Sequence, residues 1–334
     1  MIIIAVGTPQ GRDGAANLSY VEQAAMSIAN NVDHDVIVVM KSTVPVGTND
    51  WLEGIISNNL INDIQVDIVS NPEFLREGHA IHDSFYGDRI VIGSENRTAG
   101  DLVEALYSEL EIPVVRTDRR SAEMIKYASN AFLAVKISYI NQISNLCDKL
   151  GADISAVADG VGMDKRIGRQ FLNAGLGYGG SCFPKDTEAL SYLGRENDVS
   201  TSIVDAAIEA NASQRRIFVQ KVMDYFDGDV GNKQIAVLGL AFKPDTDDMR
   251  EAPSVDIVRS LVAKGAKVSV YDPVVKYTSL LDDIEVVYAE NAADCISSAD
   301  VILLVTEWEE FLEICRQHRG NVIYGRSLHE KFRV

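Results

Sequence analysis

The stretch Asp35-Val-Ile-Val-Val-Met-Lys-Ser-Thr-Val-Pro-Val-Gly-Thr48 joins a short apolar run to a polar turn with proline and glycine. The apolar run, Asp35 to Met40, predicts a buried strand. Proline and glycine punctuate the chain after it, and a helical pattern follows across Trp51 to Leu60. A strand, a turn and a helix in this order predict one unit of an α/β domain.

The same alternation continues on both sides of this unit. Met1 to Val6 predicts a preceding strand, and Ser19 with Glu22 predicts a capping box that opens a helix through Asn31. Three later strands are expected over residues 67–70, 89–93 and 112–116. Strands that alternate with helices predict a mainly parallel sheet. The polar motifs follow strands, where open α/β sheets bind ligands.

A long helix is expected from Ser121 to Leu150, because apolar residues recur there at helical spacing. A helix of this length commonly spans domains or forms a dimer interface. Lys126 and Asn130 lie four residues apart on it and share one face. Spacing alone favours a solvated face for this pair.

Further helices are expected over residues 153–160, 187–195 and 202–226, and residues 227–232 form a glycine-bearing boundary. A second set of strands follows at 234–240, 267–271, 284–287, 300–305 and 321–324, with a helix at 254–263. The predicted fold class is therefore α/β, with two Rossmann-like parallel-sheet domains joined by a helical central domain with a long helix. The predicted domains are residues 1–118, 119–227 and 232–334.

Composition excludes several classes of protein. Lys and Arg number 31 against 49 Asp and Glu, a net charge of −18, which argues against nonspecific binding to nucleic acid or to an anionic membrane. No apolar run has membrane-spanning length and the N-terminus lacks a signal peptide, so a cytoplasmic location is expected. Four widely spread cysteines without a Cys-x-x-Cys pair suggest neither a disulfide framework nor a metal site.

The most informative motif is Gly175-Leu-Gly-Tyr-Gly-Gly-Ser-Cys-Phe-Pro-Lys-Asp186. Glycine weakens regular structure, so these glycines are expected to supply positive φ angles and to bring backbone N–H groups close to a ligand. Cys182 follows them, and Lys185 or a helix beginning near Asp186 favours its thiolate. A nucleophile beside such a loop suggests covalent catalysis. The alternative is a tight turn that holds an inert, buried cysteine.

Several ordered strings resemble the nucleotide-sugar dehydrogenases of the UDP-glucose/GDP-mannose dehydrogenase family. Besides the glycine loop they are Val6–Pro9, Lys41–Gly47, Asn71-Pro-Glu-Phe-Leu-Arg-Glu77, Ala122–Lys126 with Asn130, and Gly239-Leu-Ala-Phe-Lys-Pro-Asp-Thr-Asp-Asp-Met-Arg250. The resemblance covers nearly the whole chain. It implies a two-step, NAD-dependent oxidation of a primary alcohol of a nucleotide sugar to a carboxylate, with domains for NAD, for dimerisation and catalysis, and for the UDP-sugar.

The resemblance also implies roles for individual residues. Asp186 and Lys126 hold a water and stabilise the oxyanion, Cys182 captures the aldehyde, and Glu73 is the base for thioester hydrolysis. Asn130 joins Lys126 as a donor to the tetrahedral oxyanion. For NAD the family pattern implies Thr8, Thr43, Glu77, Lys185 and Arg250. The threonines alternatively serve as turn residues, and Glu77 and Arg250 as surface charges.

For the sugar nucleotide, the family pattern implies a larger set. It comprises Glu73, Phe74, Leu75, Arg76, Glu77, Lys126, Asn130, Arg166, Phe171, Leu172, Asn173, Ala174, Gly175, Gly179 and Lys243, with Arg166 reaching across a dimer interface. UDP-glucose is the expected substrate, because Phe183 stands where GDP-mannose enzymes usually carry leucine and Ser181 where UDP-N-acetylmannosamine enzymes carry histidine. A homodimer through the central helix is the expected assembly.

One absence shapes a further expectation. A dinucleotide-binding domain normally opens with a strand, Gly-x-Gly-x-x-Gly and a helix, and no such string stands near Met1. The resemblance to the family therefore implies that the first domain is N-terminally truncated by roughly 70 residues, about two βαβ units. Gly239 to Pro244 lacks the fingerprint too and is not interpreted as an NAD site. Two hypotheses follow. The first is a dehydrogenase that is weakly active or inactive because of the truncation. The second is a non-catalytic remnant that binds UDP-sugars.

Overall fold

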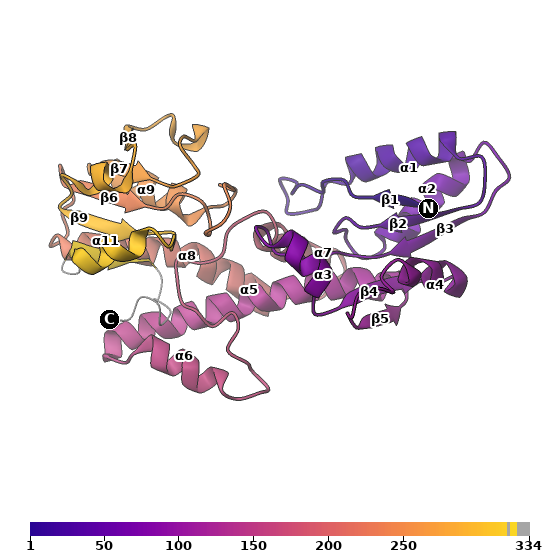
Figure 1. The fold of residues 1–334 in the computed structure, drawn as a ribbon, viewed down its shortest axis with the longest axis horizontal. Helices are drawn as coiled ribbons and strands as arrows, with labels where there is room; N and C mark the ends of the chain where they lie inside the picture. The colour runs from indigo at the N-terminus through magenta and orange to yellow at the C-terminus, as the bar shows by residue number, and fades with distance from the viewer. Residues whose placement is uncertain (319–320, 326–334) are drawn as a thin grey trace. The chain divides into compact units, whose positions relative to one another are not determined.

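The computed structural model describes residues 1–318 and 321–325 of the chain. Residues 319–320 and 326–334, which include the end of the third predicted domain, lie outside the described residues. The chain divides into two compact units (Figure 1). The first comprises Met1–Ala131 and Lys185–Thr201, and the second comprises Phe132–Pro184 and Ser202–Val334.

The first unit contains a five-stranded sheet whose strands follow sequence order. They are β1 (Ile2–Ile4), β2 (Val36–Met40), β3 (Val66–Ser70), β4 (Ile90–Ser94) and β5 (Val114–Thr117). β1, β2 and β3 run parallel, as do β4 and β5, but β4 pairs with β3 in the antiparallel sense. All five predicted strands are confirmed, and the one antiparallel junction qualifies the expectation of a mainly parallel sheet.

Helices cover both faces of this sheet. Helices α1 (Ser19–Asn31) and α2 (Thr48–Asn59) share a buried cluster with Val38 and Met40, whereas α4 (Arg97–Ala105) packs with Val39 on the opposite face. Successive strand residues point to opposite faces, so an uninterrupted apolar strand supplies both cores. A short helix, α3 (Ala80–Tyr86), follows β3 and was not predicted.

The predicted capping box at the start of α1 is wrong. Ser19 is the first residue of the helix rather than its cap, and the cap residue Leu18 makes no side-chain hydrogen bond. The Asn17 side chain instead accepts a hydrogen bond from the Ser19 N–H at 3.0 Å. Asparagine side chains also satisfy N–H groups at helix starts. Asn17, which lies outside the predicted capping box, therefore provides this contact for the helix that begins at Ser19.

Four helices follow the first sheet along the chain: α5 (Arg119–Leu150), α6 (Ile154–Gly162), α7 (Phe183–Glu196) and α8 (Ser202–Tyr225). α5 and α8 agree with their predicted ranges within two residues. α7 begins at Phe183, four residues before the predicted Thr187. Proline is tolerated in the first helical turn, so Pro184 does not delay the helix.

The second sheet lies in the second unit and is entirely parallel. Its order is β10 (Val322–Tyr324), β9 (Val301–Leu304), β6 (Gln234–Leu238), β7 (Lys267–Tyr271) and β8 (Val286–Tyr288). The order reverses between β6 and β9, which makes their carboxyl ends the switch point where open sheets bind ligands. α9 (Pro253–Ala263) and α8 pack on one face; α10 (Ala292–Ile296) and α11 (Phe311–Gln317) pack on the other.

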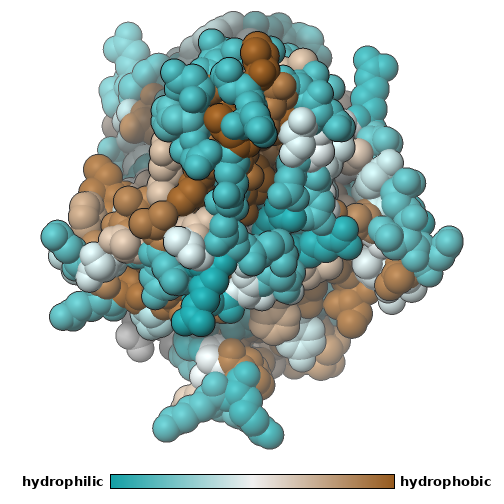
Figure 2. Space-filling view, turned by 90° about the vertical axis from the view of Figure 1, so that its right-hand side faces the viewer, coloured by the Kyte–Doolittle hydropathy of each residue, from teal (hydrophilic) through white to brown (hydrophobic). Residues whose placement is uncertain are grey.

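Hydrophilic residues dominate the face shown in Figure 2, and hydrophobic residues form smaller patches between them. This agrees with the net charge of −18. In the described part of the chain, no helix combines the length and the apolar character needed to cross a membrane.

Candidate active site

Lys126, the one cation among the predicted catalytic residues, is buried at 3% exposure. Its Nζ donates to the backbone oxygen of Glu73 at 2.6 Å and lies 3.1 Å from the Glu73 Oε1. The other carboxylate oxygen of Glu73 accepts from the Leu75 N–H at 2.6 Å. The solvated face that spacing favoured is therefore wrong, because α5 turns Lys126 toward the loop after β3.

Asp186 is a second buried charge in the same unit, at 1% exposure. Its carboxylate accepts from the Asn130 Nδ2 at 2.5 Å and from the Lys185 Nζ at 2.5 Å. It also lies in the first turn of α7, where the helix dipole favours negative charge. Two hydrogen-bond donors and the helix dipole thus offset the cost of burying this carboxylate away from water.

Sequence reasoning missed a neighbouring polar group around Lys41. The Lys41 Nζ donates to the Asn71 Oδ1 at 3.1 Å, and the Tyr107 hydroxyl donates to the same oxygen at 2.5 Å. Burial lowers the pKa of Lys41 to about 8; the nearby Glu73 opposes this shift and Lys126 adds to it. Lys41 was named from the sequence only as part of a family motif, with no role assigned to it. Its contact with Asn71 joins residues 30 positions apart, which local spacing in the sequence does not reveal.

An ion pair joins the predicted substrate segment Glu73–Glu77 to α3. Arg76 donates from its backbone N–H and its guanidinium to Asp83 at 2.6–2.9 Å. The hydrogen bond from Arg76 holds the pKa of Asp83 well below its usual range. Phe74 lies under the Arg89 guanidinium, with 4.0 Å between the Arg89 Cζ and the ring centroid. Glu77 is partly buried, whereas Leu75 and Arg76 are exposed.

The predicted cofactor residues Thr8 and Thr43 meet at the carboxyl ends of β1 and β2. The Thr8 hydroxyl donates to the backbone oxygen of Thr43 at 2.8 Å. Beside them, a Cβ added at Gly7 would meet no atom within 4 Å, so the backbone at the end of β1 borders open space. Parallel strand ends with open space and hydroxyl groups fit the approach of a dinucleotide such as NAD.

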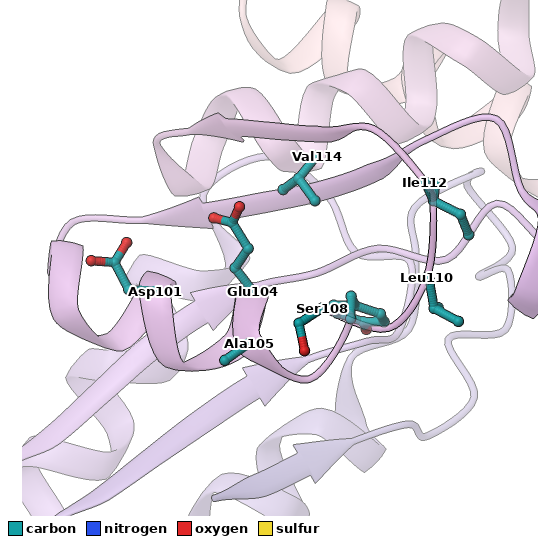
Figure 3. A pocket seen from close by; sticks show the side chains of 8 residues that line it. Asp101, Glu104, Ala105, Ser108, Leu110, Ile112 and Val114 are labelled. Carbon is teal, nitrogen blue, oxygen red and sulfur yellow. The ribbon is translucent and has the colours of Figure 1, made fainter.

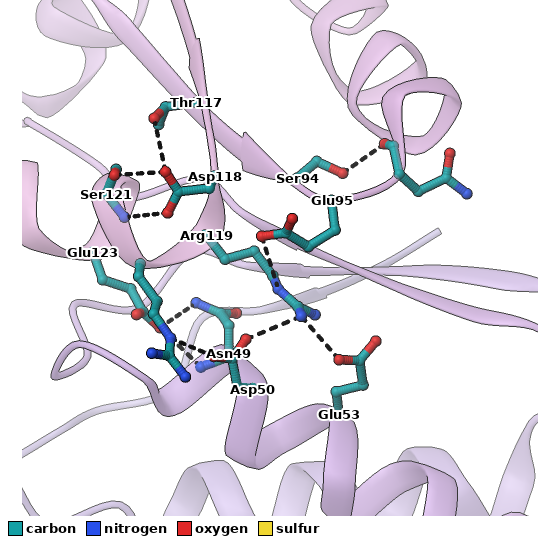
Figure 4. A network of polar contacts seen from close by, with 12 residues as sticks. Asn49, Asp50, Glu53, Ser94, Glu95, Thr117, Asp118, Arg119, Ser121 and Glu123 are labelled. Atoms are coloured by element: carbon teal, nitrogen blue, oxygen red, sulfur yellow. Dashed lines mark hydrogen bonds and ion pairs between the residues drawn. The ribbon is translucent and has the colours of Figure 1, made fainter.

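A buried carboxylate fixes the turn after β2 to the start of α5. Glu123 accepts from the Gly47 N–H at 2.6 Å. It also accepts from the N–H and the side chain of Asn49 at 2.8 and 2.6 Å (Figure 4). Burial raises the pKa of Glu123. Arg119, also buried, pairs with Asp50 and Glu53 of α2 in the same network. The Lys41–Gly47 turn and the helix that carries Lys126 are therefore anchored to each other.

Cys182 belongs to the second unit and directly precedes α7. It is half-buried, and its Sγ lies 3.6 Å from the Ser181 Oγ. The other three cysteines (Cys147, Cys295 and Cys315) are buried, and burial raises the pKa of Cys295 to about 12 and of Cys315 to about 11. Cys182 is thus the one described cysteine that is not buried, and it directly precedes the first residue of α7.

The glycines before Cys182 serve close packing as well as turn geometry. Gly177 and Gly180 have φ angles of +99° and +80°, as expected, but Gly175 and Gly179 do not have a positive φ. A Cβ at Gly179 would lie 2.3 Å from the backbone oxygen of Glu251, and one at Gly180 would lie 2.7 Å from the Phe242 ring. The loop is therefore pressed against the segment after β6, which was not foreseen.

The predicted substrate segment Phe171–Gly175 has a strained start. Phe171 has a φ of +63°, which is rare for a bulky residue. Its ring lies 6.2 Å from the Phe183 ring, next to Cys182 in the chain. Leu172 and Ala174 are buried in a hydrophobic cluster, and the Asn173 Oδ1 accepts from Arg169 at 2.8 Å.

The remaining predicted residues of the second unit lie on polar segments. Arg166 is 88% exposed and pairs with Asp164. Lys243, after β6, places its Nζ 5.3 Å from the Phe242 ring centroid. Arg250, in the same segment, pairs with Asp248 at 2.8 Å.

A cavity of 480 Å³ opens in the first unit beside α4 and β5 (Figure 3). Its lining combines the acidic residues Asp101 and Glu104 with Tyr107 and apolar residues such as Leu110 and Ile112. The Arg116 guanidinium pairs with both acidic residues. None of the predicted site residues lines this cavity.

Comparison with known proteins places these observations in one family. The family models for the NAD-binding, central and UDP-binding domains of the UDP-glucose/GDP-mannose dehydrogenase family match residues 1–111, 120–213 and 236–327. The match to residues 1–111 does not bear out the expected truncation of the first domain. That expectation rested on an absent glycine string and on the likeness of the first strand to a later strand of the family's fold, whereas the model of the NAD-binding domain matches from residue 1 to residue 111.

Similar proteins agree with this assignment. UDP-glucose 6-dehydrogenase YwqF of Bacillus subtilis is 50% identical over 311 residues, covering 93% of this chain and 70% of the relative. UDP-glucose 6-dehydrogenase of Rhizobium meliloti is 47% identical over 321 residues, covering 93% and 72%. The structure of a UDP-glucose dehydrogenase from Pyrobaculum islandicum superposes with a TM-score of 0.91 at 38% identity, covering 99% and 77%.

A second solved structure, the UDP-D-ManNAc dehydrogenase from Pyrococcus horikoshii, has a TM-score of 0.84 at 26% identity and covers 98% of this chain and 78% of that one. The chain belongs to the UDP-glucose/GDP-mannose dehydrogenase family.

Proposed function

We propose that this protein is an NAD-dependent UDP-glucose 6-dehydrogenase, which oxidises the C6 alcohol of UDP-glucose to the carboxylate of UDP-glucuronate. The observation that carries the proposal is the identity of 50% over 93% of the chain with a protein of that name. The buried Lys126–Glu73 and Asn130–Asp186–Lys185 contacts fit the charges that such an oxidation develops.

The proposed first oxidation depends on charged groups of the first unit. Thr8, Thr43, Glu77, Lys185 and Arg250 would hold NAD, and two NAD+ molecules used in succession would each supply the acceptor for one hydride from C6. Asp186 and Lys126 hold the water that receives the hydroxyl proton, and the Lys126 ammonium stabilises the alkoxide. Burial of both groups supports this role, because charge–charge interactions strengthen where water is excluded.

The proposed second half uses Cys182. Its thiolate adds to the aldehyde carbon and forms a C–S bond, while the carbonyl oxygen takes up a proton to give a thiohemiacetal. Lys126 and Asn130 stabilise the tetrahedral oxygen. Loss of the hydroxyl proton to water and of the second hydride to a second NAD+ would leave a thioester. A water deprotonated by Glu73 attacks the thioester, so that the C–S bond breaks and the thiolate leaves. Cys182 is the described cysteine that is not buried, and it directly precedes α7, which supports its role as the nucleophile.

For the substrate, we propose that the backbone of Glu73–Glu77 and the Phe171–Gly175 segment with Gly179 surround the sugar, and that Lys243 binds the diphosphate. The match of residues 236–327 to the family's UDP-binding domain supports the last assignment. Lys243 lies in the segment after β6, next to the switch point of the second sheet. The domains at 1–118, 119–227 and 232–334 and a cytoplasmic location remain part of this proposal.

We further propose a homodimer through the central helix, with Arg166 reaching the substrate of the second copy. α5 exposes an apolar stripe in the second unit, with Phe132 at 65%, Tyr139 at 53%, Leu146 at 54% and Leu150 at 73% exposure. Residues seven apart return to nearly the same helix face, so the stripe is continuous. A second copy of the same stripe would remove this apolar surface from water. A Phe132→Asp, Leu146→Asp variant that sediments as the same dimer as the wild type would contradict this interface.

The decisive experiment compares nucleotide sugars at equal concentration while NADH formation is followed. UDP-glucose should support turnover with two NADH formed per sugar, and GDP-mannose and UDP-N-acetylmannosamine should not. Cys182→Ala should abolish acid formation while UDP binding persists. Binding of UDP-glucose without any reduction of NAD would instead favour a non-catalytic UDP-sugar-binding protein, and preferred oxidation of GDP-mannose would overturn the substrate assignment.

A further inference from the structure

Neutral side chains from two helices hold the backbone of the glycine loop in the second unit. The Asn211 side chain of α8 pairs with both backbone groups of Tyr178, accepting from its N–H at 2.7 Å and donating to its oxygen at 3.0 Å. Gln214 donates to the backbone oxygen of Gly175 at 2.9 Å, and Asn141 of α5 accepts from the Gly175 N–H at 2.6 Å. Amides can donate and accept at once, so they satisfy a loop backbone as a neighbouring strand would.

Arg215, next to Gln214 on α8, extends this support to a second loop. Its side chain is only 12% exposed, and its NH2 group donates to the backbone oxygens of Tyr178 at 3.4 Å and Glu251 at 3.0 Å. Its other terminal nitrogen pairs with Asp256 at the start of α9. One guanidinium therefore bridges the loop before Cys182 and the end of the segment after β6.

The two loops also meet directly. The Gly180 N–H donates to the backbone oxygen of Arg250 at 2.8 Å. The absence of side chains at Gly179 and Gly180 lets the Glu251 backbone and the Phe242 ring come close. A displacement of the segment after β6 would therefore press on the two residues that immediately precede Ser181 and Cys182.

We propose that Arg215 is a positioning residue that couples the segment Leu240–Ala252 to the Cys182 loop, so that a nucleoside diphosphate bound at the second sheet orders the cysteine. The proposal rests on the proposed function for the assignment of UDP to this sheet. Arg215 acts through the Tyr178 and Glu251 backbones and is not assigned contact with the substrate.

The chemistry of the contact makes arginine the suitable residue. A planar guanidinium presents several N–H donors in fixed directions, whereas a lysine ammonium is a single point charge on a flexible stem. The Arg215 Nε is buried without a hydrogen-bond partner among the described residues. The side chain is thus placed to serve the two carbonyl oxygens and Asp256, although one of its own donors stays unsatisfied.

The test measures alkylation of Cys182 by iodoacetamide with and without UDP. UDP lacks the sugar that would cover the cysteine, so any protection must pass through the protein. The buried cysteines serve as internal references when each site is quantified by peptide mass spectrometry. The variants are Arg215→Met and Arg215→Lys, and the matched control is Arg216→Met, which alters an exposed neighbour that donates to Ser213.

UDP should slow alkylation of Cys182 in the wild type and in Arg216→Met. In Arg215→Met this protection should fall by about tenfold, because a charged donor to two carbonyl oxygens is lost. Arg215→Lys should recover it only in part. Binding of UDP, measured by calorimetry, should change by less than about threefold, since no ligand contact is removed.

Equal protection in the wild type and in both Arg215 variants would overturn the coupling, as would an absence of any UDP effect on the wild-type cysteine. An equal loss in Arg216→Met would also overturn it, because the effect would then be general to α8. Alkylation requires neither NAD nor turnover. A failure to oxidise UDP-glucose would therefore count against the proposed function and leave the coupling to be judged on its own result.

Discussion

The charged residues of the first unit and the cysteine loop of the second unit are held by different kinds of contact. Lys126, Glu73 and Asp186 are fixed by ion pairs and charged hydrogen bonds of 2.5–3.1 Å. The Gly175–Cys182 loop is fixed instead by neutral amides, one guanidinium and glycines that admit close backbone approach.

This difference follows from what each region is proposed to do. Groups that move protons or stabilise an oxyanion need charge, and burial strengthens the field of that charge. A loop that presents a nucleophile needs a defined backbone position, which shape and amide pairing provide without placing further charge beside the thiolate. Removal of a charge should therefore affect rate most in the first unit, and addition of volume should affect folding most in the second.

The largest expected effect is on turnover, from Lys126→Met. Loss of one donor to a developing oxyanion typically lowers kcat by about 10²–10³-fold. Steady-state rates with UDP-glucose and NAD measure it, with Lys149→Met as a control because Lys149 is an exposed lysine on the same helix. A variant that retained a rate within a few-fold of the wild type would remove Lys126 from the chemistry and weaken the contrast between the regions.

The next effect is on folding, from Gly180→Ala. The new Cβ would lie 2.7 Å from the Phe242 ring at a φ of +80°. Overpacking and the left-handed conformation together should cost about 2–4 kcal/mol of unfolding free energy. Gly228→Ala, also at positive φ but with no atom within 4 Å of its Cβ, should cost only about 1–2 kcal/mol. Denaturant titration measures both, and equal costs would refute the role of close packing.

A smaller effect should separate acid from neutral pH in Asp83→Asn. The hydrogen bond from Arg76 lowers the pKa of Asp83 from its ordinary 3.8. A carboxylate with a lowered pKa stabilises the folded state above about pH 4, and this contribution is lost as the pH falls through the folded-state pKa. The variant should lose about 1–2 kcal/mol at pH 7 and converge with the wild type in acid. A pH-independent difference in urea titrations would contradict this.

The smallest effect concerns Lys41, which has no counterpart in the loop of the second unit. Burial lowers its pKa from 10.5 to about 8, so between these pH values the unfolded chain binds a proton that the folded chain lacks. The free energy of unfolding of the wild type should therefore rise relative to that of Lys41→Met as the pH increases across this window. The slope should correspond to less than one proton bound by the unfolded chain in excess of the folded chain. Denaturant titrations at several pH values measure the slope, and a slope of zero or of opposite sign would show Lys41 to be unperturbed.

The periodic pattern of the sequence was sufficient to predict most of the fold. Apolar runs between turns located the ten strands of the described residues, because strands buried on both faces must be continuously apolar. Helical spacing located α5 and α8 within two residues. The capping box failed because it depends on a single side chain: Asn17, rather than Ser19, accepts a hydrogen bond at the start of α1. The sheet is mainly parallel, as predicted, but the antiparallel pairing of β4 with β3 leaves no periodic signal in the sequence.

By itself, the sequence determined the order of strands and helices, the family and the residue types available for chemistry. Only the tertiary structure decided which groups meet: that Lys126 is buried on Glu73 rather than solvated, that Lys41 shares Asn71 with Tyr107, and that Gly179 and Gly180 admit the segment after β6. The contacts of Arg215 with two separate loops were likewise found only in the tertiary structure. Local order follows from spacing of a few residues, whereas these contacts join positions tens of residues apart, and only packing of the folded chain determines them.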